Sequence, residues 1–301
     1  MTNLQTQPVS CPGCHRTEAA TVTKVFSSPI RIMTDLVRCQ ICGLAYLNPR
    51  PSLSHEKTFY EKEYFERADF REWKDNRTRF FQFALNKIEA SISERKLLDV
   101  GCGGGFFLDL ARSHGWEVTG IELSEAAIRH ARESLDLSVI QAELKNSHFP
   151  PNEFSVVTLW NVLDQMWDPA EQLEEIFQVI KPGGLLVLRV SNATFHLGLH
   201  RFLGFLKSVY LIPRDQREPT VFHLCMFDTV SIKHFLQTKG FTETKISNSP
   251  LDAEPQVLVA LLGPTGSRIV TRLCYALAKV LHRITGKVLG PSLFVTTRKS
   301  L

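Results

Sequence analysis

The chain has 301 residues, of which 44% are hydrophobic and 22% are charged, and its formal net charge is +4. This length suits one sizeable core with an appendage or two modest domains, and this composition excludes an intrinsically disordered chain. A small positive charge does not by itself indicate nucleic-acid binding.

The first residues, MTNLQTQPVSCPGC, show neither the basic segment nor the apolar run of a secretory signal. The apolar stretch 197–213 is interrupted by His200, Arg201 and Lys207, and it is shorter than the roughly 20 apolar residues of a membrane span. We therefore expect a cytoplasmic protein in a reducing compartment. There the seven cysteines are thiols or metal ligands rather than disulfides.

Two close cysteine pairs lie near the start of the chain. Each has the spacing C-x2-C, and the four residues are Cys11, Cys14, Cys39 and Cys42. Four thiolates suit tetrahedral zinc, and Gly13 and Gly43 suit turns that direct backbone N–H groups towards sulfur. The pattern predicts a zinc-ribbon-like module with a structural zinc over residues 1–55, with unliganded thiols as the alternative.

Residues 56–95 become aromatic and charged, and FERADFREWKDNRTRFFQFALNKIEASI is typical of one or two amphipathic helices. We expect a helical cap or lid here. Tyr60, Tyr64 and Phe65 are its aromatic candidates, although ordinary helix packing explains them equally well.

A strand, a glycine loop and a helix follow in KLLDVGCGGGFFLDLARS, and Glu122 ends the next short strand. Glycine lets the backbone approach a ligand closely, and a carboxylate at that strand end can accept hydrogen bonds from two ribose hydroxyls. The fingerprint of nicotinamide oxidoreductases would require glycine where Phe106 stands, which disfavours that class. Strands and helices then alternate to the end of the chain. We therefore expect a doubly wound parallel α/β domain over 96–301, with an insertion at about 193–222.

Several segments together resemble the class I S-adenosylmethionine-dependent methyltransferases over roughly residues 60–245. They are LLDVGCGGGFFL, GIELSEAAI, AELKNSHFPPNEFSVVTLWNVLDQMWDP, VIKPGGLLVLRVSN and HLCMFDTVSIKHFLQTKGF. The resemblance implies an enzyme with a Rossmann-like, mostly parallel seven-stranded sheet that carries helices on both faces. It also implies S-adenosyl-L-methionine as the cofactor. The four-cysteine segment is similar to the N-terminal module of bacterial small-molecule and sugar-pathway methyltransferases.

By this resemblance, specific residues surround the cofactor. Those near its methionine part are Asp99, Gly101 and Gly103, with Cys102 as a loop residue rather than a nucleophile. Glu122 binds the ribose, Leu123 packs on the adenine, and Ala142 or Glu143 lies at the adenine edge. Asn161 lies close to the sulfonium. The chain departs from the family pattern at Gln165, where many relatives have histidine.

The acceptor is less defined. The chain lacks the Asn/Asp-Pro-Pro-aromatic and Pro-Cys motifs of base and amide methyltransferases, which favours O- or C-methylation of a small-molecule, glycan or lipid-linked acceptor. A hydroxyl acceptor would benefit from a base, for which the candidates are Asp164, His196 and His223.

Two alternatives stay open. The first is an RNA-directed methyltransferase that uses the zinc module for binding, but residues 1–50 contain only five basic residues and no cluster of them, so nucleic acid is not an expected partner. The second is a non-catalytic cofactor-binding protein on the same fold, against which the intact glycines and Glu122 argue.

The segment 267–288 predicts an amphipathic helix. At 100° per residue, one arc holds Arg268, Arg272, Lys279, Arg283 and Lys287, and the adjoining arc holds Ile269, Leu273, Leu277, Val280, Ile284 and Val288. Such a helix can make peripheral contact with an anionic membrane. We favour the alternative in which the apolar arc packs on the sheet.

Overall fold

The computed structural model describes residues 6–27, 32–63, 69–209, 223–250 and 259–301. Tyr64, Phe65 and most of the loop expected within 193–222 lie outside these residues. Among the described residues, no helix is both long and apolar enough to cross a membrane.

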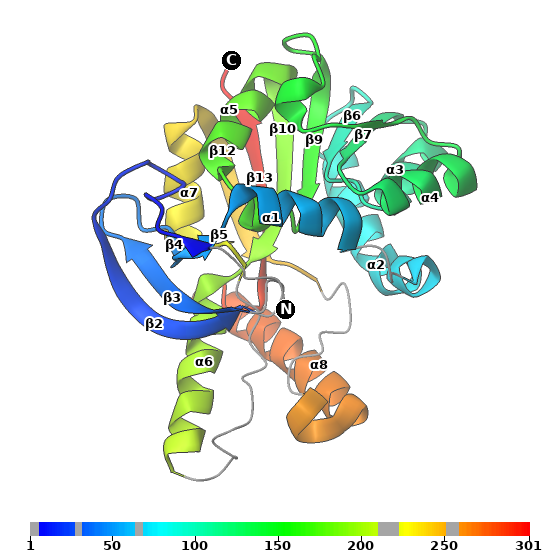
Figure 1. Ribbon diagram of the computed structural model, residues 1–301. Helices are drawn as coiled ribbons and strands as arrows, with labels where there is room; N and C mark the ends of the chain where they lie inside the picture. Colours follow the sequence, from blue (N-terminus) through cyan, green and yellow to red (C-terminus); the bar gives the residue numbers. More distant parts are fainter. Residues whose placement is uncertain (1–5, 28–31, 64–68, 210–222, 251–258) are drawn as a thin grey trace.

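A seven-stranded sheet forms the centre of the molecule (Figure 1), as expected. In spatial order its strands are β12 (Phe241–Asn248), β13 (Ser292–Lys299), β10 (Ile180–Ser191), β9 (Phe154–Trp160), β6 (Lys96–Val100), β7 (Glu117–Glu122) and β8 (Val139–Gln141). The strands from β10 to β8 pair in parallel, and β13 pairs antiparallel with β10 and β12. Every residue of β9 is buried, which agrees with its mostly apolar sequence FSVVTLW.

Helices cover both faces of this sheet. One face packs against α2 (Phe70–Glu89), α3 (Phe106–Ser113) and α4 (Glu125–Leu135), and the other against α5 (Pro169–Val179) and α7 (Thr229–Thr238). Side-chain caps fix where three of these helices begin. Ser124 accepts a hydrogen bond from the Ala127 amide, and Asp168 and Asp228 cap α5 and α7 in the same manner.

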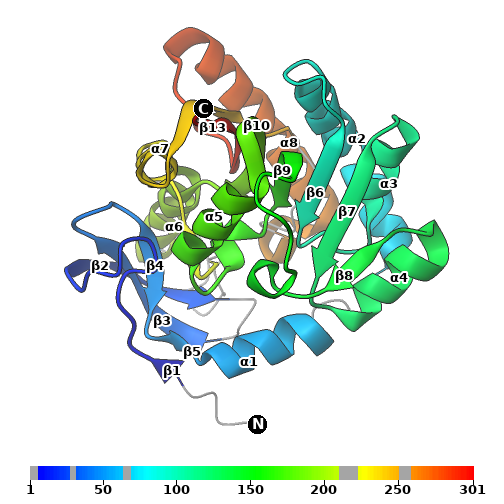
Figure 2. The ribbon, with the colours of Figure 1, turned by 90° about the horizontal axis from the view of Figure 1, so that it is seen from above.

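The cysteine-containing segment forms a second sheet beside α7 (Figure 2). Its strands, in spatial order, are β11 (Cys225–Met226), β4 (Ala45–Asn48), β3 (Ile32–Cys39) and β2 (Ala19–Ser27), and β1 (Thr6–Gln7) pairs with β5 (Arg50–Pro51). Strand β11 follows β10 and α6 in the chain, so this sheet joins segments that lie far apart in the sequence. Its buried side chains, such as Tyr46, join the same core as Leu188 and Phe227.

Short helical segments complete the fold. They are α1 (Leu53–Thr58), the π-helical turn η1 (Phe59–Glu63), and the 3-10 turns η2 (Leu144–Asn146) and η3 (Leu163–Gln165). Two longer helices, α6 (Ala193–Ser208) and α8 (Val259–Thr285), extend beyond the lower end of the sheet in Figure 1. The domain limits expected at residues 55 and 95 stay predictions.

Two glycines with the same backbone conformation allow a matched test of the loop before α3. Gly105 and Gly115 both have φ +82°, but a Cβ at Gly105 would lie 2.6 Å from Leu137 Cδ1 and 3.1 Å from Ala131 Cβ, whereas Gly115 has open space. We expect Gly115→Ala to cost about 1 kcal/mol of backbone strain and Gly105→Ala about 1–3 kcal/mol more. Urea denaturation of both variants measures this, and equal losses would contradict it.

Candidate functional site

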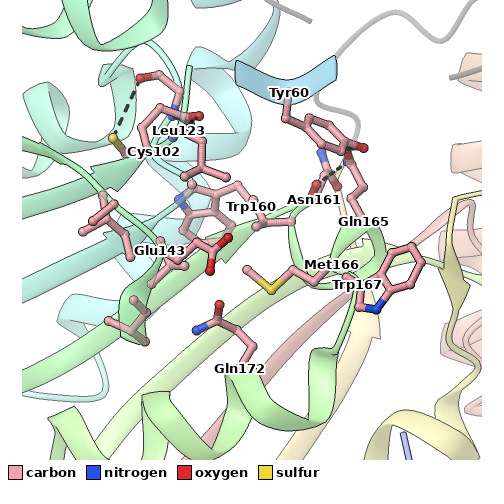
Figure 3. Close-up of a pocket in the computed structure, with 18 of the residues that line it drawn as sticks. Tyr60, Cys102, Leu123, Glu143, Trp160, Asn161, Gln165, Met166, Trp167 and Gln172 are labelled. Atoms are coloured by element: carbon pink, nitrogen blue, oxygen red, sulfur yellow. Dashed lines mark hydrogen bonds between the residues drawn. The ribbon is translucent and has the colours of Figure 1, made fainter. Parts of the chain in front are cut away.

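A pocket of about 280 Å³ opens at the carboxyl ends of the parallel strands. Its walls come from the glycine loop after β6, the end of β7, the turn η2 and the segment from β9 to α5 (Figure 3). The carboxyl edge of a doubly wound sheet is the position where such folds bind ligands.

The glycine loop forms the wall between β6 and α3. The amides of Gly101 and Cys102 both donate to Ile121 O, at 2.9 and 3.1 Å, and so fasten the loop to β7. Gly101 has φ +68° and Gly103 φ +54°, a region that side chains disfavour. A Cβ at Gly101 would also lie 2.7 Å from Val162 Cγ2. The loop therefore exposes backbone to the pocket.

Glu122 joins this loop to the turn after β7. Its Oε2 accepts a hydrogen bond from the Gly103 amide at 2.8 Å, and its Oε1 accepts from the amides of Leu123 (2.8 Å) and Ser124 (3.0 Å). Burial raises the pKa of this carboxyl, and the backbone amides of Ser124, Gly103 and Leu123 oppose that rise. A carboxylate offers about four lone-pair positions, so a ligand hydroxyl can still bind.

Asp99 lies beneath the loop rather than in the pocket wall. Its Oδ1 accepts a hydrogen bond from Thr158 Oγ1 at 2.6 Å, and its Oδ2 is buried without a hydrogen-bond partner in the described part of the chain. Burial raises the pKa of Asp99 to about 8, against the lowering effect of the Thr158 hydroxyl. Buried Cys102 lines the pocket, and burial also raises the pKa of its thiol well above the usual value. A neutral thiol does not act as a nucleophile.

Leu123, Ala142 and Glu143 line the end of the pocket near β7 and β8. Lys145 Nζ lies 3.4 Å from Glu143 Oε2 and 3.5 Å from Glu171 Oε2. In Figure 3, Gln172 faces Glu143 across this end. The three residues that the family resemblance implied for adenine thus lie together.

A hydrogen-bonded chain closes the opposite end. Arg189 Nη1 donates to Asn161 Oδ1 at 2.6 Å, Gln165 Nε2 donates to Asn161 O, and Tyr60 Oη donates to Gln165 Oε1 at 2.9 Å. Asn161 itself has φ +59°. The amide at Gln165 therefore orders the turn after β9 and connects it to the helical segment before α2.

The pocket also contains residues that were not among the predicted cofactor-binding or catalytic residues, although Tyr60 was a candidate for the lid. Tyr60, Arg77, Trp160, Met166 and Trp167 line the pocket. Trp160 Nε1 is buried and lacks a hydrogen-bond partner among the described residues. These side chains come from three separate segments, and no spacing in the sequence indicates their convergence.

The three candidate bases do not line this pocket. Fully buried Asp164 accepts a hydrogen bond from the Ser191 amide at 2.9 Å, and His196 Nε2 lies 3.2 Å from Pro291 O. Burial, and then the neighbouring His223, lower the pKa of His196 to about 4, while Asp164 acts in the opposite direction. The structure therefore groups the three behind the pocket, and their catalytic role stays a prediction.

The four cysteines of the N-terminal segment converge on one point. Their sulfur atoms all lie within 4.8 Å of one another, with Cys11–Cys42 and Cys14–Cys39 separations of 3.5 Å. These separations are too long for disulfides, whose sulfur atoms lie about 2.05 Å apart. The Gly13 amide donates to Cys11 Sγ at 3.4 Å, as the knuckle turn requires. Four convergent thiols are a ligand set that could hold one metal ion.

Comparison with known proteins gives a consistent set of relatives. A family model described as "Methyltransferase domain" matches residues 64–246. The ubiquinone biosynthesis O-methyltransferase of Thiobacillus denitrificans is 33% identical over 137 residues, and that of Pseudomonas aeruginosa is 32% identical over 136. Each match covers 43% of this chain and 58% of the relative, so the chain spans less than two thirds of the length of these relatives.

Solved structures give the same fold. Phosphoethanolamine N-methyltransferase 2 of Haemonchus contortus, in complex with S-adenosyl-L-methionine, superposes with a TM-score of 0.53 at 16% identity. The match covers 85% of this chain and 63% of that one. At this identity the likeness establishes the architecture of the sheet and its helices alone.

The buried carboxyl of Asp99 predicts a pH-dependent stability. Its folded pKa of about 8 exceeds the ordinary value of 3.8. Between these two pH values, the folded chain binds a proton that the unfolded chain releases. This stabilisation is complete below pH 4 and is lost as the pH rises towards 8. Asp99→Asn mimics the protonated form. Its free energy of unfolding, relative to that of the wild type, should therefore rise by about 2 kcal/mol or more between pH 5 and pH 8. Denaturant titrations at several pH values measure this, and a constant difference would contradict it.

Proposed function

Because this chain belongs to the methyltransferase-domain family that matches residues 64–246, we propose that it is an S-adenosyl-L-methionine-dependent methyltransferase that methylates a small-molecule hydroxyl. The observation that carries the proposal is the position of Glu122, which lies in the pocket wall and is bonded to the glycine loop. A buried acid held beside exposed backbone suits a ligand with a ribose.

The proposed binding mode follows the length of the pocket. Glu122 accepts the ribose hydroxyls, Leu123 packs on the adenine, and Ala142 and Glu143 contact its edge. Gly101, Cys102 and Gly103 bring backbone to the methionine part, and Asp99 supports the loop from below. Asn161 then lies nearest to the reacting centre, at the end held by Arg189 and Gln165.

The bound cofactor supplies an activated methyl group on its sulfonium, so the protein's task is to align the acceptor with the bond that breaks. Beside polar residues such as Arg77 and Gln165, five aromatic or apolar side chains line the pocket: Tyr60, Phe81, Trp160, Met166 and Trp167. They suit an apolar or aromatic acceptor, in agreement with relatives named for O-methylation in ubiquinone biosynthesis. Glycan-linked acceptors fit this wall less well than lipid-like ones, and C-methylation is the alternative reaction.

A proton must leave the acceptor hydroxyl. Asp164, His196 and His223 are the proposed bases on the β10 side of the site. His196 suits the role electrostatically, because its lowered pKa keeps the imidazole neutral near pH 7. It can act only if a rearrangement or a water chain connects it to the pocket.

We also propose that the four-cysteine cluster holds a structural zinc ion. Thiolates at about 2.3 Å from a tetrahedral zinc would lie about 3.8 Å from one another. The observed separations of 3.5 Å for two pairs, with all four sulfur atoms within 4.8 Å, fit that arrangement. The ion would join the turn at Cys11 to the turn at Cys39.

Glu122→Ala tests the cofactor site. The variant loses the charge-assisted hydrogen bond to the ribose, so S-adenosyl-L-methionine affinity should fall by about 2 kcal/mol or more. Isothermal calorimetry measures the affinity, and transfer of a labelled methyl group to a small aromatic hydroxyl acceptor should fall with it.

Glu125→Ala is the control, because Glu125 is an exposed acid on the neighbouring helix α4. Circular dichroism must show that Glu122→Ala is folded, since Glu122 also accepts three backbone hydrogen bonds. A folded Glu122→Ala protein that binds the cofactor as tightly as the wild type would refute the proposal.

Metal analysis tests the cysteine cluster. One zinc per chain is expected, and Cys39→Ser should lower that content and reduce thermal stability, because structural zinc contributes directly to folding. Cys274→Ser is the matched control, since Cys274 lies on α8 outside the cluster. A natively purified protein that holds no zinc and has four reactive thiols in this segment would exclude the zinc site.

A further inference from the structure

Helix α8 exposes large apolar side chains along one face. Five of them are between 49% and 75% exposed: Ile269, Leu273, Leu277, Val280 and Ile284. The opposite face is the buried one, where Thr271 and Ala278 pack inward and Asn248 Nδ2 donates to Ala278 O at 3.2 Å. The sequence favoured an apolar arc packed on the sheet, and the structure shows that arc in solvent.

Cations lie beside the exposed apolar face. Arg272, Lys279, Arg283 and Lys287 are all exposed, and no acidic residue follows Glu254 in the sequence. At 100° per residue, the first three lie on the arc next to the apolar one. The side chain of Arg268 lies outside the described part of the structure. One side of α8 is therefore both apolar and positively charged.

Helix α6 has a similar exposed face. Phe202, Phe205 and Val209 are exposed at spacings that place them on one arc, and Arg201 is exposed beside them. The start of α6 is tied to the segment that follows α8, because Asn192 Nδ2 donates to Val288 O and Gly290 O at 3.3 and 2.8 Å. Both helices thus extend from the carboxyl end of β10 (Figure 1), the edge at which the pocket also opens.

We propose that the exposed faces of α6 and α8 together, here called the α6–α8 surface, bind an anionic membrane. Apolar side chains of an interfacial helix enter the boundary between headgroups and acyl chains, and flanking cations bind lipid phosphates. Both features are present on α8, and α6 adds two phenylalanines.

Other occupants match this surface less well. A second copy that docks through antiparallel α8 helices about a two-fold axis would bring the cation-bearing edges of the two helices together, which costs free energy. A nucleic acid would pair with the cations but leave Leu273 and Leu277 in water. Membrane binding uses no residue of the pocket, so the proposal goes beyond the proposed function and does not depend on it.

Vesicle sedimentation tests the proposal. The full-length wild type should sediment with vesicles of phosphatidylcholine and phosphatidylglycerol at low salt, and much less with pure phosphatidylcholine or at high salt. Leu273→Ser/Leu277→Ser and Lys279→Glu/Arg283→Glu should each weaken binding by roughly tenfold or more. All four side chains are exposed, so the variants should fold.

Matched controls separate this surface from general effects. Val230→Ser removes an exposed apolar side chain from α7, and Arg129→Glu/Lys233→Glu reverses two exposed charges elsewhere, so both should bind vesicles as the wild type does. A wild type that stays in the supernatant with anionic vesicles at low salt overturns the proposal. So do α8 variants that bind like their controls, or a dimer that Leu273→Ser/Leu277→Ser dissociates without any vesicle binding. Cofactor affinity, measured separately, reports on the proposed function alone.

Discussion

The hydrogen bonds that one buried carboxylate, Glu122, requires also hold the two loops of the site in place. Glu122 is 9% exposed, and a buried carboxylate without partners would cost several kcal/mol. Three backbone amides meet this need, and they belong to the glycine loop and to the turn that starts α4. The same hydrogen bonds therefore stabilise the acid and hold two loops in register. A ligand that binds Glu122 meets walls whose relative position is already fixed.

The N-terminal segment contacts the pocket through one buried cation, Arg50 on β5. Arg50 is 2% exposed, stacks 3.9 Å over the ring of Trp167 and donates from Nη2 to Trp167 O at 2.7 Å. Arg38 donates from Nη1 to Asp228 Oδ2 at 2.9 Å, at the start of α7. Trp167 lines the pocket, so the segment that contains the cysteine cluster also positions one wall of the site. Arg50 thus links this segment directly to a side chain of the pocket.

The sequence predicted those features that depend on residues close together in the chain or on the order of strands and helices. Alternating strands and helices predicted the doubly wound sheet, which is confirmed. The spacing from Gly101 to Glu122 likewise brings two ends of adjacent parallel strands together. Tyr60 and Gln165 were not predictable as partners, because their contact joins segments far apart in the chain and depends on how η1 packs. The pairing of β11 with β4 escaped prediction for the same reason.

Helix α8 shows why an amphipathic pattern does not identify the buried face. A helix can approach a sheet closely through small side chains. Thr271 and Ala278 provide such a face, and Asn248 from β12 donates a hydrogen bond to the backbone carbonyl of Ala278. That contact leaves the larger residues, among them Leu273 and Ile284, in water, where each forgoes burial worth about 1.5–3 kcal/mol. The fold of the isolated chain gives no reason for five such residues on an exposed face beside cations. A membrane surface that covers this face would account for them.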